Sequence, residues 1–337
     1  MKIYQILIIS AAIWMLLILS GCSEKESTVQ STTTDEQALK LAVTEIDSVA
    51  DFSASDEISI DDDGMNNPEF DGISGGMMTN VRYDSSITDS IYPVRWGRHI
   101  FWQNIVRHYD VTIQGDTLAF VLITKTIPGE FIVAWGTRTI DTVIIQDTVK
   151  KSFTETVQRK VIFKRVARTD NPQRNWIPIA ITIVQGKTND VNNFAIASLE
   201  VSVPARSYDT TFVDPLNHWF RLGLFRGSVQ KCVAGDSAIV KLTITSTDSA
   251  PEMVYIRHGI GKGRMERRRT AMTLESTTGT AGNYVRVYSK SIRTRLPVGV
   301  LAARYNMIAD VISNGTIYST TLPFSNEFWG VPYIVVR

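Results

Sequence analysis

The chain has 337 residues, a formal net charge of +1 and only two cysteines. Its length is sufficient for two domains with separate hydrophobic cores, and so few cysteines exclude a small scaffold held together by disulfide bonds. The near-neutral total conceals an asymmetry. Residues 23–92 carry 16 acidic and 3 basic side chains, a net charge of −13, whereas the chain from Pro93 onward carries 18 acidic and 31 basic ones, a net charge of +13. An acidic segment therefore precedes a basic body.

The first 22 residues have the pattern of an export signal. Lys2 gives a positive end, and an apolar run follows from Ile6 to Leu19. At about 14 residues this run is typical of a signal peptide, because a membrane-spanning helix needs roughly 20 apolar residues. It ends at Leu19-Ser20-Gly21-Cys22, which resembles the lipobox of bacterial lipoproteins. An uncleaved N-terminal membrane anchor is the alternative interpretation.

The resemblance to lipoproteins implies that residues 1–21 are removed as a signal peptide and that Cys22 is acylated, for example with palmitate. Two or three acyl chains hold a protein on a membrane almost permanently, whereas one chain anchors it weakly. The expected location is the cell envelope, and Ser23 after the cysteine favours the outer membrane of a Gram-negative bacterium. A lipidated Cys22 leaves Cys232 without an intrachain disulfide partner, either as a small buried residue or as a reactive thiol.

Residues 22–92 are predicted to form an acidic linker with one short helix near residues 35–50. Thr34 and Gln37 match a capping box, and apolar side chains recur at helical spacing after them. Such a stripe needs a partner, so the helix either docks on a β domain or is marginally stable.

A run of acidic residues in the same linker, Asp61-Asp62-Asp63-Gly64, suggests a calcium loop. An EF-hand starting at Ser59 would need a glutamate where this chain has Phe70, so the spacing fails. We expect a solvated acidic loop, with weak calcium binding as the alternative.

Residues 93–206 are predicted to form an all-β domain, a sandwich or a partly open barrel. Val106–Ile113 and Thr117–Ile127 flank a short turn and predict a hairpin. Pro128-Gly129 predicts the next turn, before a strand at Phe131–Trp135.

Later strands of this domain show alternation. Between Ser152 and Ala167 one face is predicted to carry Phe153, Val157, Val161 and Phe163. Pro178 indicates an edge position in the next strand, because proline cannot donate to a ladder. Asn192–Val203 supplies a last strand.

Residues 207–337 are predicted to form a β-sandwich of about seven short strands. Val240–Thr245 alternates after a turn at Gly235-Asp236-Ser237, and Asn314-Gly315 predicts a hairpin between Tyr305–Ile312 and Thr316–Thr321. Together with turns at Asp248–Pro251 and Leu296–Gly299, this pattern resembles immunoglobulin-like modules of bacterial surface proteins, although no cysteine pair is present. The resemblance implies an interaction or spacing role and no catalysis.

No motif indicates an enzyme, a cofactor or a metal site. The four histidines lack metal-ligand spacing, and Gly186-Lys187-Thr188 lacks the preceding glycine of a phosphate-binding loop. Asp209, Asp214 and Glu327 could supply a carboxylate pair for glycoside hydrolysis, but the sequence does not show their separation. We therefore expect no catalytic residues.

Two groups of residues are candidates for surface contacts. A basic cluster suits phosphate, sulfate or carboxylate groups, and its alternatives are a solvated loop or a docking site for the acidic linker. It consists of Arg257, Lys262, Arg264, Arg267, Arg268 and Arg269. Trp219 and Trp329 are either packed in the body or form an aromatic platform for a sugar or a protein.

The leading hypothesis is a lipid-anchored envelope protein that acts as a non-catalytic binding or scaffolding module for a protein or glycan partner. Its membrane contact is the lipid on Cys22, and nucleic acid is not an expected partner. The alternative is a carbohydrate-binding or carbohydrate-degrading surface protein, for which exposed tryptophans would be evidence. The sequence does not predict the oligomeric state.

Overall fold

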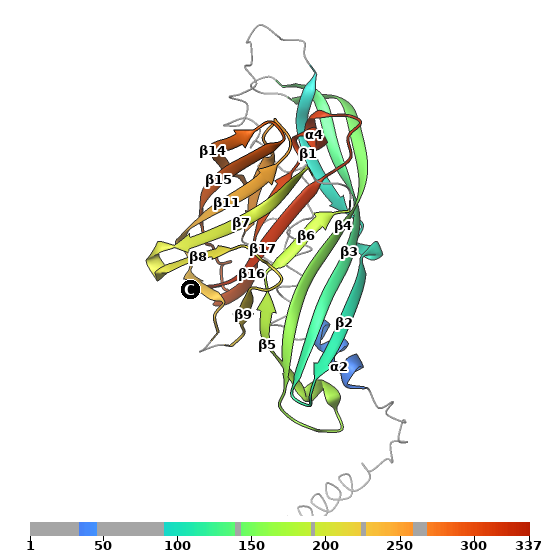
Figure 1. Ribbon diagram of the computed structural model, residues 1–337, viewed down its shortest axis with the longest axis vertical. Coiled ribbons are helices and arrows are strands. Elements are labelled where there is room, and N and C mark those ends of the chain that lie inside the picture. The colour runs from blue at the N-terminus through green and yellow to red at the C-terminus, as the bar shows by residue number, and fades with distance from the viewer. Residues whose placement is uncertain (1–33, 46–90, 139–142, 190–192, 224–226, 259–267) are drawn as a thin grey trace, which may run out of the picture.

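The structure, a computed structural model, describes residues 34–45, 91–138, 143–189, 193–223, 227–258 and 268–337. It is nearly all β, as the sequence predicts, with its strands in two sheets (Figure 1). The predictions for Cys22 and for the loop at Asp61–Asp63 lie outside the described residues.

Sheet A is a twelve-stranded sheet whose main path runs β1-β3-β4-β6-β17-β16-β12-β13. Four further strands join this path: β2 pairs with β3, β5 with β4, β9 with β5, and β10 with β17. All of these pairs are antiparallel except β10–β17, which is parallel. The strands are β1 (Tyr92–Ile100), β2 (Val106–Gln114), β3 (Leu118–Arg138), β4 (Val143–Arg165), β5 (Trp176–Thr182), β6 (Val184–Thr188), β9 (Trp219–Arg221), β10 (Gln230–Val233), β12 (Met253–His258), β13 (Arg268–Ala271), β16 (Ala302–Ile312) and β17 (Asn326–Val336).

Sheet B has five antiparallel strands in the order β14-β15-β11-β7-β8. The predicted alternation of β11 is confirmed, because Val240, Leu242 and Ile244 are buried while Lys241 and Thr243 are half-buried. The strands are β7 (Phe194–Val203), β8 (Tyr208–Phe212), β11 (Ser237–Ser246), β14 (Thr273–Thr280) and β15 (Asn283–Arg293).

The two hydrophobic cores share a central layer of sheet A, formed by β12, β16 and β17. Alternation along β16 sends Met307 and Ala309 into the core that faces sheet B, and Ile308 and Ile312 into a second core inside sheet A. Because both faces of β16 are covered, every residue from Tyr305 to Ile312 is buried. The packing against sheet B has the sandwich character predicted for the C-terminal half.

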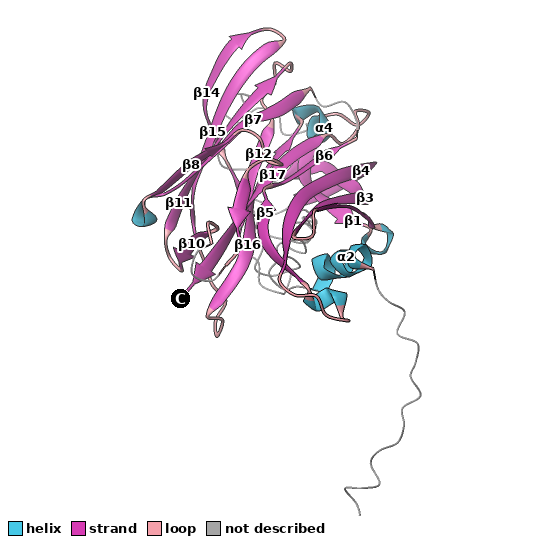
Figure 2. Cartoon of the chain, turned by 60° about the horizontal axis from the view of Figure 1, so that its bottom comes forward, coloured by secondary structure: helices cyan, strands magenta, loops and turns pink. Residues whose placement is uncertain are grey.

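Sheet A curls around the second core (Figure 2), and side chains of its first strand contact side chains of its last strands. The ring of Trp96 on β1 lies 5.2 Å from the ring of Tyr255 on β12, centroid to centroid. The guanidinium of Arg269 on β13 lies 3.9 Å from the centroid of the Trp96 ring. These side-chain contacts complete the enclosure between β1 and β13, which are not paired with each other. The curled sheet uses strands from beyond Arg206 as well, so a partly open barrel formed by residues 93–206 alone stays a prediction.

Short helices accompany the sheets. The N-terminal helix α2 (Asp35–Glu45) begins where the sequence predicts it, and its capping box is formed: Thr34 N donates to Gln37 Oε1 at 3.2 Å, and Gln37 N donates to Thr34 Oγ1 at 3.3 Å. The others are α4 (Asn314–Tyr318) and the 3₁₀ turns η2 (Trp102–Asn104), η3 (Pro172–Arg174) and η4 (Pro204–Arg206).

The predicted turn at Pro128-Gly129 is wrong. β3 continues through both residues, with Pro128 opposite Thr154 and Gly129 opposite Phe153 on β4. Glycine is needed there for space, since an added Cβ would lie 2.6 Å from His99 O and 2.6 Å from the Phe153 ring. The residue therefore marks a close approach of β1 and β4 rather than a chain reversal.

The predicted hairpin turn at Asn314-Gly315 is also wrong. These residues begin helix α4, and the connection from β16 to β17 continues to Ser325. Thr316 and Ile317 are buried, and Phe324 at the end of the connection stacks on Phe131 with 4.6 Å between ring centroids. Burial of this longer connection, which closes one end of the second core, outweighs the local preference for a tight turn.

The predicted hairpin around Gly115 is confirmed, since β2 pairs with β3 and Gly115 has a φ of +57°. The predicted domain boundary at Arg206 falls in η4, between the paired strands β7 and β8. Sheet A contains strands from both sides of this position, as does sheet B. The division into two domains there stays a prediction.

Candidate functional site

The interior of curled sheet A contains a buried charge cluster, formed by Arg98, Glu155, Arg257, Asp310 and Asn326. None of these residues is more than 5% exposed. They come from five different strands, β1, β4, β12, β16 and β17. Strand alternation points each of them inward, at positions between apolar residues of the second core. The cluster therefore lies where strands distant in sequence converge.

Asp310 is the centre of this buried charge cluster. Arg98 Nη2 donates hydrogen bonds to both of its carboxylate oxygens at 2.7 Å, and Arg257 donates to Oδ2 from Nε at 3.1 Å and from Nη2 at 2.9 Å. One carboxylate thus binds two guanidinium groups. Asn326 Nδ2 donates to Glu155 Oε1, and Arg98 Nη1 lies 3.9 Å from that same oxygen.

The two carboxylates of the cluster have pKa values shifted in opposite directions. Burial alone would raise the pKa of Asp310, but Arg98 and Arg257 outweigh burial and hold that pKa below its ordinary value. At Glu155 burial prevails, and the negative charge of Asp310 adds to it, so the pKa of Glu155 is raised although Arg98 opposes the shift. The difference follows from geometry, because Arg98 hydrogen-bonds Asp310 directly and only approaches Glu155.

Lys151 lies on the same face of β4 as Glu155 and is also buried. Its Nζ donates to Thr316 O and to Ser319 O, both at 2.6 Å. These are carbonyls of the last turn of α4 and of the residue after it, which have no partner within so short a helix. Burial lowers the pKa of Lys151 to about 8. The lysine thus fixes α4 over the end of the second core.

A second buried ion pair connects sheet B to the segment that enters β12. Arg286 Nη1 on β15 donates to Glu252 Oε1 at 2.6 Å, and Arg286 Nη2 donates to Ser249 O at 3.0 Å. Tyr288 Oη donates to Glu252 at 3.2 Å. Burial raises the pKa of Tyr288, so its hydroxyl stays a donor at neutral pH.

Both arrangements connect strands. Their carboxylates accept hydrogen bonds from arginine, asparagine or tyrosine side chains, which makes removal of any one partner costly. Within the described ranges no group of three or more His, Cys, Asp or Glu side chains is arranged to hold a metal ion.

The predicted basic cluster is only partly described. Lys262, Arg264 and Arg267 lie outside the described residues, and Arg268 lies on β13 opposite His258. Of the other two members, Arg257 is buried inside sheet A and binds Asp310, and the half-buried Arg269 stacks on Trp96 and Tyr255. The structure therefore gives Arg257 an internal carboxylate partner. An anion-binding role for the remaining members stays a prediction.

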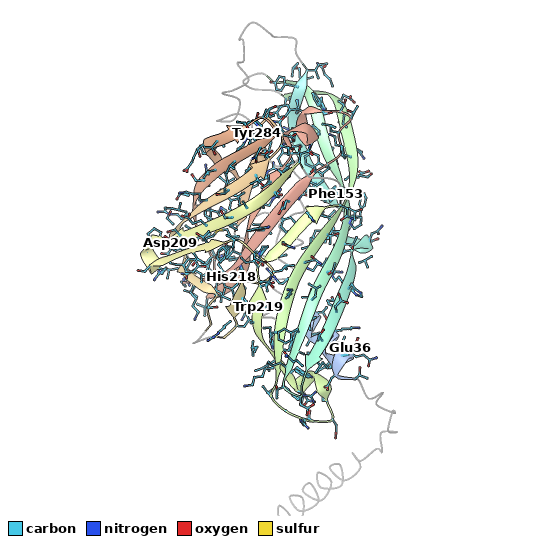
Figure 3. All side chains as sticks on the ribbon, in the orientation of Figure 1. Glu36, Phe153, Asp209, His218, Trp219 and Tyr284 are labelled. Atoms are coloured by element: carbon cyan, nitrogen blue, oxygen red, sulfur yellow. The ribbon has the colours of Figure 1, made fainter. Side chains whose placement is uncertain are left out.

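The two candidate tryptophans lie in different surroundings. Trp329 on β17 is 4% exposed and belongs to the core that faces sheet B, so its burial counts against a role as a sugar platform. Trp219 is half-buried on β9, where it pairs with Thr182 on β5 (Figure 3). Its neighbour His218 packs between Phe212 and Phe220. Only Trp219 of the two remains a candidate for contact with a ligand.

Helix α2 packs against the body through a docking joint, which consists of Asp35, Arg165 and Trp176 with the buried helix residues Leu39, Ala42 and Val43. Trp176 Nε1 donates to Asp35 Oδ1 at 3.0 Å, and Arg165 Nη2 donates to Asp35 Oδ2. The Arg165 guanidinium also lies 4.5 Å from the centroid of the Trp176 ring.

Burial on its own raises the pKa of Asp35, but the hydrogen bonds from Trp176 and Arg165 bring it below the ordinary value. The carboxylate is therefore ionised at neutral pH, and its charge is compensated by Arg165. The apolar stripe predicted for this helix packs against the body, since Leu39, Ala42 and Val43 are part of the core shared with sheet B.

The buried charge cluster was not predicted from the sequence. A signal was present, because Glu155 and Arg159 fall on the predicted inward face of β4, between Phe153 and Phe163. Charged residues at inward positions of a strand indicate buried ion pairs, although their partners come from other strands and the period does not identify them.

No protein-family model matches the chain, and no curated protein sequence matches it either. Among the residues that the structure describes, no helix has both the length and the apolar character needed to span a membrane.

Proposed function

We propose that the protein is a cell-envelope lipoprotein, anchored through acyl groups on Cys22, whose β body acts as a non-catalytic binding or scaffolding module. The observation that carries the proposal is the ending of the apolar run at Leu19-Ser20-Gly21-Cys22. Localisation in the outer membrane of a Gram-negative bacterium is part of the proposal, on the basis of Ser23.

The β body supports a scaffolding role through its interior chemistry. The charges of Asp310 and Glu252 are used to connect strands, since their oxygens accept hydrogen bonds from Arg98, Arg257 and Arg286. Such groups stiffen the body that carries its outer surfaces. An immunoglobulin-like character of the sandwich, with the interaction or spacing role that it implies, belongs to the same proposal.

Lipidation is tested by expressing the full chain in bacteria with an alkyne analogue of palmitate. The wild-type chain and Cys232→Ser are expected to incorporate the label and to sediment with membranes, whereas Cys22→Ser loses the label and is released. Cys232→Ser is the matched control because it removes the only other cysteine. Undiminished membrane attachment of Cys22→Ser would favour the uncleaved anchor instead.

The alternative, a carbohydrate-binding or carbohydrate-degrading surface protein, depends on Trp219 now that Trp329 is buried. Sedimentation of the mature chain with insoluble envelope polysaccharides tests it. Saturable binding that is lost in Trp219→Ala and retained in Trp329→Phe would favour this alternative. If no polysaccharide binds, a protein is the favoured partner of the scaffold.

A further inference from the structure

We propose that the docking joint determines which surface of the body faces the membrane: the end of sheet A formed by the β2–β3 turn and η3 lies toward the lipid. The inference rests on the proposed lipidation of Cys22 and adds to it a specific membrane-facing surface.

The first step concerns chain length. Thr34 comes only 12 positions after Cys22, a stretch that spans at most about 42 Å even when fully extended. After α2, the next residue of the body that the structure describes is Ile91, 69 residues after Cys22, which corresponds to a reach of up to about 240 Å. Docking of α2 therefore shortens the maximum reach about six-fold.

The second step concerns where the docking joint lies. Arg165 N donates to Thr117 O at 2.8 Å, so the joint is level with the first residues of β3. Figure 1 shows α2 beside β2 at one end of the long sheet A, and Figure 2 shows it against the same end from a second direction. α2 also contacts η3 and β2. The anchor is thus connected to one extremity of the body.

The third step is the distance to the opposite end. β3 runs for 21 residues from Leu118 to Arg138, a length of up to about 65 Å at the usual rise of a strand. The first strand of the body begins at that far end, because Tyr92 pairs with Gly136. The short connection from Cys22 holds the α2 end near the bilayer, whereas the far end can extend well away from it.

Contacts with the body stabilise the docking joint. An isolated helix of 11 residues is marginal in water, so α2 is stable chiefly through its contacts with the body. Its Leu39 is fully buried, and its Asp35 accepts hydrogen bonds from two side chains of the body. Leu41 on the opposite face is 41% exposed. Figure 3 shows Glu36 of α2 at the same extremity of the molecule, far from Tyr284.

The experiment measures energy transfer from a fluorescent probe on the body to acceptor lipids, with the full lipidated chain in vesicles. Probes are attached to Gln114→Cys beside the β2–β3 turn, or to Ile144→Cys at the far end, both exposed positions. The native cysteines do not interfere, because Cys22 would be acylated, and Cys232 is buried with its pKa raised to about 11. We expect at least two-fold greater transfer efficiency from Gln114→Cys than from Ile144→Cys.

Leu39→Asp is expected to release α2 and to reduce transfer from the Gln114→Cys probe to the level of the Ile144→Cys probe. Leu41→Asp is the matched control, since it introduces the same charge on the exposed face of the helix and should leave transfer unchanged. Asp35→Asn is a second variant that weakens the docking joint without placing a charge in the core, and near-ultraviolet circular dichroism verifies that the body stays folded.

Equal transfer from the two probes in the wild-type chain would overturn the inference, and so would transfer that is insensitive to both Leu39→Asp and Asp35→Asn. Vesicle flotation is carried out first. Protein that does not float with vesicles would contradict lipidation of Cys22 itself, whereas floating protein with equal transfer contradicts only the orientation.

Discussion

Asp310 shows how a single carboxylate can join strands that are far apart in sequence. It binds Arg98 on β1 and Arg257 on β12, and the first of these partners is 212 positions away. A buried ion pair often contributes little net stability compared with apolar residues of the same shape, but removal of one partner leaves an uncompensated charge in the interior. Here two guanidinium groups depend on one carboxylate.

Replacement of that carboxylate by an amide is therefore expected to be strongly destabilising. Asp310→Asn should lower the free energy of unfolding by about 3–5 kcal/mol, measured by urea denaturation at pH 7. Asp209→Asn, an exposed position on β8, should change it by less than about 0.5 kcal/mol. Similar effects of the two substitutions would mean that Arg98 and Arg257 do not depend on Asp310.

The contribution of Glu155 to the free energy of unfolding depends on pH. Because its pKa is raised in the folded state, the folded protein holds this proton to a higher pH than the unfolded chain does. The resulting stabilisation is present at pH values below the pKa of Glu155 in the unfolded chain, and it is lost as pH rises through the pKa of Glu155 in the folded protein. Glu155→Gln imitates the protonated form, so it should be more stable than the wild type at pH 7 and nearly equal at pH 4.

Each unit by which the pKa of Glu155 is raised corresponds to about 1.4 kcal/mol of this difference. Urea denaturation of Glu155→Gln and the wild type across pH 4–7 measures it. A difference that stays constant over the range would show that Glu155 has the same pKa in the folded and the unfolded chain.

The alternation of the sequence correctly predicted which residues of β4 point inward. It did not predict that two of these residues are charged. Phe153, Val157 and Phe163 are buried as expected, while Glu155 and Arg159 share that face. Inward positions are expected to be apolar unless a partner is known, and the partners of these two, Asn326 and Asn306, lie on β17 and β16. Such pairs depend on the assembled tertiary structure, which local patterning does not contain.

At the scale of elements, local signals succeeded where all the interacting atoms lie within a few residues. The capping box of α2 and the β2–β3 hairpin are of this kind. Asn314-Gly315 failed because Lys151, 165 positions away, binds the carbonyl of Thr316 in α4. Pro128-Gly129 failed because strand pairing on both sides of β3 overrides turn preference.

The close approach at Gly129 leads to a prediction for β3. A methyl group there would collide with backbone on β1 and with the Phe153 ring on β4, so Gly129→Ala should destabilise the protein by about 1–3 kcal/mol in thermal or urea denaturation. Gly115→Asn is the control, since its position has positive φ, open space around it and a residue type that tolerates that conformation. Equal stability of Gly129→Ala and the wild type would mean that β1 and β4 can separate there.

At the scale of the whole molecule, the shared layer of β12, β16 and β17 makes the two cores interdependent. Side chains of β16 alternate between the core inside sheet A and the core facing sheet B. Loss of either core would expose one face of the same strands. We therefore expect a single cooperative unfolding transition.

Phe131→Ala in the core of curled sheet A and Leu242→Ala in sheet B should shift this one transition, each by about 2–5 kcal/mol. Tryptophan fluorescence and far-ultraviolet circular dichroism should give coincident curves for both variants. Two separate transitions, each sensitive to one substitution, would instead support independent domains divided near Arg206.

The contact between Arg98 and Asp310 also affects when the curled sheet can close during synthesis of the chain. Ribosomes add roughly 5–20 residues per second, so the 212 positions between these partners correspond to roughly 10–40 s of synthesis. For most of that interval neither β12 nor β16 has been synthesised, and sheets with such distant pairings form slowly even when complete. The curled sheet therefore cannot enclose its second core until synthesis has passed β16, whichever strands of β1–β4 have paired before then.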